Sequence, residues 1–473
     1  MMCMQKQRRS NWDQVKQTGE YIKVHKKQLL ESVRGPQPDL ALQSFYRDMS
    51  SLCARPDAFI GPSHLNAIIG STAKAWAPAW ARLDQQKQQQ ARHEMHAFLT
   101  KMWQQLQPLL PDVGEWAAAN LLWSSAKLGV DPDALVPGMT GSLAHQFMAD
   151  MDAAAGQGFA NVLVACAKLQ LSPCHGGLLK AILNRLATAD MSTFEPQSVA
   201  NILHSLATIP AVAPSVAVLD VLCQRFGVLL KSRQAVELPT AQNIANTVWA
   251  LSKLKHAPSD ELAMSMVGRM VALCHVPRQQ PTPQAISNVL LACAELGLPV
   301  KQADTDGLAS FLLSLGRQHM NRQHCTNTAW SLAVLGHLRQ AQLELLLDKI
   351  CALSVRHREQ SGPSLLNEAD LRQLYQALDW LQPPQNARTQ QQGKAWLNLK
   401  GRLGSLGTRP DPAEPHPRAQ LVCLALTQLS LRFKATPAIS GYRTAAVLEP
   451  TGDEAPIVVS LESKIYLNNK RSR

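Results

Sequence analysis

Apolar and polar positions recur along this chain in a phrase of about ten residues that opens with asparagine. Two of the copies read NLLWSSAKLG and NTVWALSKLK, and the spacings between successive asparagines are 41, 40, 45, 42 and 39 residues. A period near 40 residues is typical of stacked helical repeats, in which each unit buries its apolar face against its neighbours. The pattern predicts an all-α fold, a right-handed α-solenoid of paired antiparallel helices. The copies begin at Asn120, Asn161, Asn201, Asn246, Asn288 and Asn327.

The first helix of each predicted pair carries the phrase. With the asparagine numbered 0 and successive residues placed about 100° apart, positions −2, +1, +2, +5 and +8 fall on one side of the helix. These positions are mostly Leu, Ile, Val, Cys or Ala, and small residues flank them at −1 and +6. A second amphipathic helix is expected after each turn, as at residues 178–187, 218–230 and 262–274.

Polar residues occupy the opposite side of the first helix, at positions −4, 0 and +7. Stacking of the repeats would align them in a polar ladder, which we take as the candidate RNA-binding surface. A structural alternative remains, because a repeated amide can also hydrogen-bond within or between repeats. Residues that are identical in every repeat contact every unit of a ligand in the same way. They position the ligand but do not distinguish one base from another. The candidates are Gln157, Gln197, Gln242, Gln284 and Gln323 at −4, the six asparagines at 0, and Lys127, Lys168 and Lys253 at +7.

Positions −3 and +3 vary between repeats, as residues that discriminate between bases must. Tryptophan and histidine at +3 are able to stack on a base, although packing between repeats explains the tryptophans equally well. Basic residues late in the second helices (Arg185, Arg225 and Arg269) are candidates for phosphate contacts or for helix C-terminal interactions. The base-discriminating candidates are Ser198, Asn243 and His324 at −3, and Trp123, His204, Trp249 and Trp330 at +3.

The regions around the repeats differ in composition. We expect a basic N-terminal segment at 1–34, degenerate helical capping repeats at 35–110 and the repeat array at 111–381. A Pro-, Gly- and Gln-rich linker follows at 382–418. Residues 419–473 then predict a helix (LVCLALTQL) and two strands (YRTAAVLEP and PIVVSLESKIYL), a small incomplete α/β module.

Charge and cysteine usage narrow the class of protein. The net charge of +12 comes from residues 1–34 and 388–473, which contribute +5 and +7, so the stretch between them is neutral. Polyanion attraction is therefore expected mainly at the two ends. No apolar run approaches the ~18 residues of a membrane span, and no secretory signal is evident. The ten cysteines lack zinc spacing, and Cys166 and Cys293 share one repeat position, which suggests buried thiols in a reducing compartment.

No motif for catalysis is apparent. A Gly-rich phosphate loop, an H-E-x-x-H motif and a recurring Ser/His/Asp arrangement are missing from the sequence. We therefore expect no enzyme activity, no catalytic residue, no metal and no cofactor.

The repeated phrase, with Trp123, Trp249 and Trp330 and the endings KLG, KLQ and KLK, resembles the octotricopeptide repeats (OPR). These are abundant in green-algal organelle proteins and related to the Leu-rich region of the FASTK family. The resemblance covers roughly residues 111–381. It implies an organellar protein of the chloroplast or mitochondrion that binds single-stranded RNA, an organellar transcript or rRNA. Roles in RNA stabilisation, processing or translation are implied, together with other RNA-processing proteins as partners.

The C-terminal tail resembles the first half of a RAP domain, with Tyr442, IVVSLE ending at Glu462, and Asn468 or Asn469 as the matching residues. It departs from that pattern at Ala445, where the family has an aspartate, and at residues 463–465. The alternative to RNA binding is a HEAT/armadillo-like scaffold that binds a peptide or a partner helix.

Overall fold

The asparagine phrases each form one α-helix in the computed structural model. The structure describes residues 2–170, 177–210, 212–234, 238–316, 319–361, 366–381, 398, 400–403, 433–435, 438–439, 442–448 and 457–460. The phrase helices are α5 (Glu115–Leu128), α8 (Gly156–Leu169), α10 (Pro196–Thr208), α12 (Ala241–Leu254), α14 (Pro283–Leu296) and α16 (Arg322–Val334).

The last residue of the phrase, at position +9, explains where most of these helices end. It has positive φ in five repeats, with values of 66° at Gly129 and 63° at Gly297. Such a left-handed residue reverses the chain and allows the last helical carbonyls to be capped. Glycine adopts this conformation without steric cost, which accounts for the Leu-Gly ending of three phrases, at Gly129, Gly297 and Gly336. The other three positive-φ residues at +9 are Gln170, Lys255 and Gly336.

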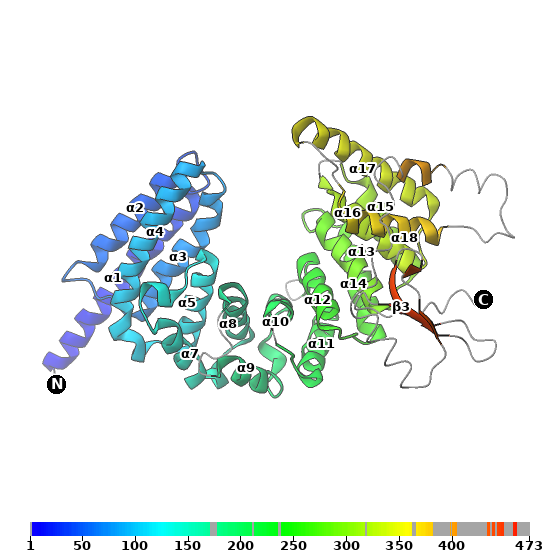
Figure 1. Ribbon diagram of the computed structural model, residues 1–473. Helices are drawn as coiled ribbons and strands as arrows, with labels where there is room; N and C mark the ends of the chain where they lie inside the picture. Colours follow the sequence, from blue (N-terminus) through cyan, green and yellow to red (C-terminus); the bar gives the residue numbers. More distant parts are fainter. Residues whose placement is uncertain are drawn as a thin grey trace. The chain divides into compact units, whose positions relative to one another are not determined.

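The chain forms two units, Met1–Leu238 and Pro239–Arg473. In the first unit, a first layer of helices packs each against the next: α1 (Met2–Ser32), α3 (Pro62–Trp80), α5, α8 and α10. A second layer covers one face of the first (Figure 1). It consists of α2 (Pro38–Cys53), α4 (Gln85–Leu106), α6 (Pro132–Leu135), α7 (Met139–Ala149), α9 (Leu178–Leu186) and α11 (Val216–Leu230), with 3₁₀ helices η1 (Gln107–Asp112), η2 (Met151–Ala153) and η3 (Met191–Thr193).

The second unit repeats this arrangement. Its first layer is α12, α14, α16 and α18 (Glu368–Trp380), and its second layer is α13 (Asp260–Cys274), α15 (Gln302–Ser314) and α17 (Gln340–Ser361). Helix α18 packs on α16 as α16 packs on α14, although its sequence lacks the asparagine. The all-α solenoid of paired helices expected from the sequence is therefore confirmed.

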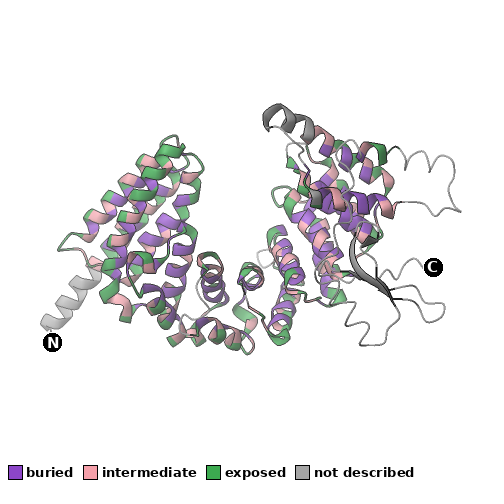
Figure 2. Ribbon diagram, in the orientation of Figure 1, coloured by how far each residue is buried: buried purple, intermediate pink, exposed green. Residues whose placement is uncertain are grey.

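Apolar residues of the phrase form the core between the two layers and between neighbouring first helices. Positions +1 and +2 are buried in every phrase helix, as Leu121 and Leu122 illustrate in α5. Figure 2 shows buried residues on the helix faces that meet a neighbour. Each fully buried Leu, Val or Ile contributes about 1.5–3 kcal/mol relative to its exposed state. Cys166 and Cys293 are buried too, and burial raises the pKa of the Cys293 thiol to about 12.

Four short strands follow in the C-terminal region: β1 (Phe433–Ala435), β2 (Ala438–Ile439), β3 (Tyr442–Leu448) and β4 (Ile457–Ser460). Strand β3 pairs antiparallel with each of the others, and a register shift between Thr444 and Ala446 interrupts its pairing with β4. β3 and β4 lie within the two segments expected to be strands. The expected helix LVCLALTQL and residues Glu462, Asn468 and Asn469 lie outside the described residues, as does most of the 382–418 linker.

Candidate nucleic-acid interface

The glutamines of position −4 lie at the start of their helices. Gln157, Gln197, Gln242, Gln284 and Gln323 are each the second residue of a phrase helix, and all five are exposed. The first turn of a helix also leaves its backbone N–H groups without intrahelical partners. The glutamines therefore form a solvent-accessible row along one edge of the first layer within each unit.

The lysines of position +7 lie at the other end of the same helices. Lys127, Lys168 and Lys253 are exposed and belong to the last turn of α5, α8 and α12. Two of them sit over the tryptophan one turn earlier: Lys127 Nζ is 5.6 Å from the Trp123 ring centroid, and Lys253 Nζ is 5.9 Å from that of Trp249. Each pair is a cation–π contact that orients the ammonium on the outer face.

The glutamine and lysine rows are well separated. Positions −4 and +7 are eleven residues apart, which is about 16 Å along a helix at ~1.5 Å per residue. A single extended strand crossing the helices therefore follows one row or the other. The stripe expected from the sequence resolves into two parallel rows with the asparagines between them.

The asparagines of position 0 face their neighbours more than the solvent. Asn161 Nδ2 donates a hydrogen bond to Asn120 Oδ1 over 2.8 Å. In the second unit, the buried Asn327 accepts a hydrogen bond from Gln373 Nε2 over 3.2 Å. These contacts support the structural alternative for Asn120, Asn161 and Asn327. Asn201, Asn246 and Asn288 are half-buried, and Asn246 accepts a hydrogen bond from Gln242 of its own helix.

The candidates at −3 serve their own helix starts. Thr240 donates its backbone N–H to Asn243 Oδ1 over 3.0 Å, and Asn321 donates its backbone N–H to His324 Nδ1 over 3.2 Å. Both are capping boxes, which satisfy N–H groups at the helix N-terminus. Ser198 is buried. Asn243 and His324 are therefore engaged in capping their own helices, and Ser198 is enclosed in α10.

The candidates at +3 divide by burial. Trp123, His204 and Trp249 are half-buried, so part of each ring reaches the surface. Trp330 is only 6% exposed, and its Nε1–H donates to Gln376 Oε1 over 2.7 Å. Trp330 therefore packs against α18 and is not accessible for stacking on a base.

Electrostatic coupling links neighbouring helices of the first unit. Burial lowers the pKa of Lys168, and repulsion from Lys127 on the preceding helix lowers it further. Burial also lowers the pKa of His204, with an additional contribution from Lys168. Lys168 is thus close enough to Lys127 on α5 and to His204 on α10 to repel each of them when charged.

Helix α3 carries a further exposed lysine that the asparagine phrase does not predict. Ser71-Thr72-Ala73-Lys74 matches Ser124-Ser125-Ala126-Lys127, and Gly70 approaches Ser124 Oγ to 3.7 Å from an ideal Cβ position. The two helices are therefore in register, with Lys74 at the level of Lys127. Lys74 is exposed. The short S-[ST]-A-K match was the available signal, but Ala67 stands where the phrase has asparagine.

Two of the three basic residues expected late in the second helices, Arg225 and Arg185, contact other groups of the protein. Arg225 donates from Nε to the Phe194 carbonyl and from Nη2 to the Ser192 carbonyl, each over 2.8 Å. Arg185 forms an ion pair with Asp152, with Nε 2.7 Å from Oδ1. Both join a second-layer helix to the 3₁₀ turn that precedes the first helix of the same repeat. The phosphate-contact interpretation of Arg225 and Arg185 is therefore not adopted.

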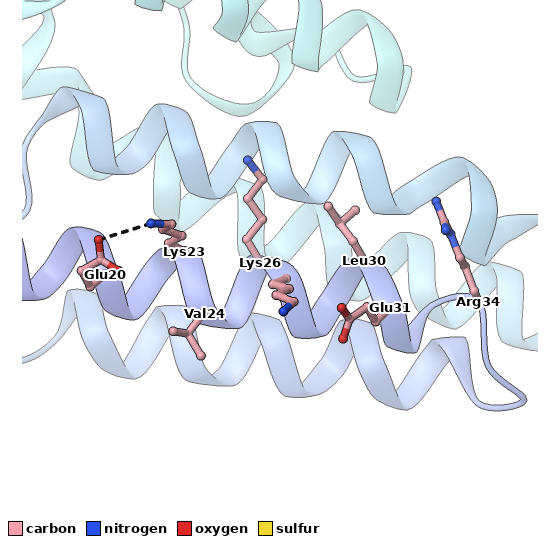
Figure 3. A pocket seen from close by; sticks show the side chains of 8 residues that line it. Glu20, Lys23, Val24, Lys26, Leu30, Glu31 and Arg34 are labelled. Atoms are coloured by element: carbon pink, nitrogen blue, oxygen red, sulfur yellow. Dashed lines mark hydrogen bonds and ion pairs between the residues drawn. The ribbon is translucent and has the colours of Figure 1, made fainter.

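A shallow groove runs along α1, within the basic N-terminal segment (Figure 3). Lys26 and Arg34 extend to one side of the helix, and Val24 to the other. Two acidic residues interrupt the basic ones, and Glu20 pairs with Lys23 at 3.5 Å. This mixed charge makes α1 a weaker polyanion surface than its lysine content suggests. The groove is lined by Glu20, Lys23, Val24, Lys26, Lys27, Leu30, Glu31 and Arg34.

Among the described residues, His, Cys, Asp and Glu side chains nowhere gather in a group of three suited to a metal ion. The helices of the described part of the chain are likewise too short or too polar for any of them to cross a membrane.

In comparisons with known proteins, neither a protein-family model nor a curated protein matches this chain.

Proposed function

We propose that this chain binds single-stranded RNA across the exposed face of its first-layer helices. The observation that carries the proposal is the row of coupled cations beside half-buried rings on α5, α8 and α10. Lys127 and Lys168 offer charge for phosphates, while Trp123 and His204 offer planar surfaces for bases. Cationic grooves with stacking side chains are the common solution for binding single strands.

Helical-repeat proteins that read RNA bind about one base per repeat. On that rule, the clear phrases and the degenerate ones cover roughly six to ten nucleotides. A bound segment of this length is shielded from nucleases or kept unpaired. Together with the OPR resemblance, this supports a role in stabilisation, processing or translation of an organellar transcript or rRNA, with other RNA-processing proteins as partners. The compartment is the chloroplast or the mitochondrion.

A protein-binding scaffold is the second candidate. The stretch between the two basic ends carries no net charge. Apolar side chains also reach the surface of the first unit, notably Trp116, Val216 and Val228. A HEAT/armadillo-like scaffold would use such apolar positions and would show little dependence on salt.

Binding to a labelled single-stranded oligoribonucleotide of about twelve nucleotides, measured by fluorescence anisotropy, tests the proposal. We expect the affinity to fall steeply between about 50 and 200 mM salt, since phosphate neutralisation releases counterions. The same sequence annealed to its complement is the control, because stacked bases cannot reach Trp123 or His204. Equal affinity for single strand and duplex would contradict the proposal. Crosslinking in cells that recovers only protein would favour the scaffold.

A further inference from the structure

We propose that the phosphates of the bound strand run along one row of lysines in the first unit, formed by Lys74, Lys127 and Lys168. The strand then crosses the C-terminal halves of α5 and α8 and the middle of α3, away from the glutamine row. This inference rests on the proposed RNA binding and adds the path of the strand and a residue, Lys74, in α3.

The chemistry of the row suits a uniform ligand group. Every phosphate is the same, so contacts to phosphate need the same cation in each repeat. Position +3 lies four residues earlier, about 6 Å along the helix. In the three helices that carry the row, the side chain there changes from Gly70 to Trp123 and Val164, and in α10, where His204 holds +3, Thr208 replaces the lysine of +7. A constant cation next to a variable side chain is the arrangement expected for a backbone track beside base contacts.

The lysines of the row have no acidic partner among the described residues. Other cations of the same unit do: Lys87 Nζ lies 2.9 Å from Asp39 Oδ2, and Arg185 pairs with Asp152. Lys127 is close enough to Lys168 to lower its pKa. Like charges without counterions repel, and an anionic ligand relieves that repulsion.

A helix-dipole role for these lysines accounts for only part of the row. Cations in the last turn of a helix interact favourably with the C-terminus, and Lys127 and Lys168 lie there. Lys74 does not, because α3 continues for six further residues to Trp80. The property that all three lysines share is their equivalent position on neighbouring first-layer helices.

The second unit lacks such a row. After Lys253, position +7 is Glu295 in α14 and Val334 in α16, and Glu295 accepts a hydrogen bond from Ser252 of the preceding helix. One cation followed by an anion cannot hold successive phosphates. The electrostatic part of binding is therefore assigned to the Met1–Leu238 unit.

The test compares two triple variants of the full chain. The row variant is Lys74→Gln/Lys127→Gln/Lys168→Gln. The matched control, Arg47→Gln/Lys101→Gln/Lys180→Gln, removes the same charge from exposed positions on the second-layer helices α2, α4 and α9. The affinity of each for a random-sequence oligoribonucleotide of about twelve nucleotides is followed as a function of salt. Circular dichroism confirms that both remain folded.

We expect the slope of log affinity against log salt to fall by about two in the row variant, since each lost phosphate contact removes about 0.7. The control should keep the parent slope, and Lys127→Arg/Lys168→Arg should keep it as well. A row variant with the parent slope, or a control that loses as much as the row variant, overturns the phosphate track and leaves RNA binding intact. A parent chain that binds no RNA overturns the proposed function itself.

Discussion

Asn161 donates a hydrogen bond from Nδ2 to Oδ1 of Asn120 on the neighbouring helix, over 2.8 Å. The two residues hold the same position in successive repeats and are both half-buried. This contact joins α5 to α8 in the row between the glutamines and the lysines. It gives the repeated asparagine a role in holding neighbouring repeats together.

Replacing Asn161 with alanine removes the donor and leaves Asn120 Oδ1 unpaired in a half-buried site. We expect the free energy of unfolding to fall by about 1–2 kcal/mol, measured by urea denaturation. Asn201→Ala is the control, because Asn201 has the same position and burial but makes no hydrogen bond with a described side chain. Equal losses in the two variants would show that the inter-repeat bond contributes nothing.

Gly156 opens α8 directly against Phe194. A Cβ at this position would lie 2.7 Å from Phe194 Cγ and 2.9 Å from its Cα. Gly156→Ala should therefore lower the free energy of unfolding by about 1–3 kcal/mol through overpacking. Thermal denaturation followed by circular dichroism measures the change.

Gly141 in α7 provides the opposite case. Nothing lies within 4 Å of its ideal Cβ position, so Gly141→Ala should raise stability by about 0.5–1 kcal/mol through helix propensity. A destabilised Gly141→Ala protein would contradict the helical assignment of this residue. A tolerated Gly156→Ala would contradict the close packing of Phe194.

Trp330 and Trp249 share position +3 but should respond differently to substitution. Trp330→Phe removes the indole donor to the buried Gln376 and should lower the free energy of unfolding by about 1–3 kcal/mol. Trp249→Ala should weaken RNA binding by about 1–3 kcal/mol through lost stacking. RNA affinity from fluorescence anisotropy and the free energy of unfolding from urea denaturation, measured for both variants, test whether the two tryptophans have these different roles. Loss of RNA affinity in Trp330→Phe without loss of stability would reverse it.

Stability should also depend on pH through His204. Its pKa is lowered in the folded chain, by burial first and by Lys168 second, so the unfolded chain binds a proton more readily. The resulting stability is fully present above the unfolded value of about 6.5 and is lost as pH falls towards the folded value. His64 and His324 have lowered pKa values too and act in the same direction.

His204→Gln should therefore show a smaller loss of stability than the parent between about pH 7 and 5. Urea midpoints measured across this range test the sign. A parent chain that gains stability on acidification would rule out the burial of a neutral His204.

The repeat period predicts the paired-helix solenoid, because the phrase contains both the apolar positions of the first helix and the residue at +9 where most of these helices end. Three first-layer helices, α1, α3 and α18, do not carry the asparagine phrase. Helix α3 has Ala67 and α18 has Gln373 where the phrase has asparagine. Stacking depends on the apolar face, so a repeat can exchange the polar asparagine and still pack in the first layer.

The phrase also does not predict which side chains at position +3 are buried. Trp123, Trp249 and Trp330 hold the same position in the phrase, yet of the three only Trp330 is enclosed, because Gln376 of α18 packs on it. The accessible part of a repeat side chain depends on what the next repeat places against it. For Trp330, the covering residue Gln376 lies 46 residues further along the chain and outside the phrase.

An asparagine carboxamide has two N–H donors and two acceptor lone pairs. The bond between Asn161 and Asn120 uses one donor of the first and one lone pair of the second. Each amide is thereby fixed in plane and orientation while keeping hydrogen-bonding capacity for a third group. An asparagine that holds two repeats together can thus offer its remaining donors and acceptors, already oriented, to a base or sugar of a bound strand.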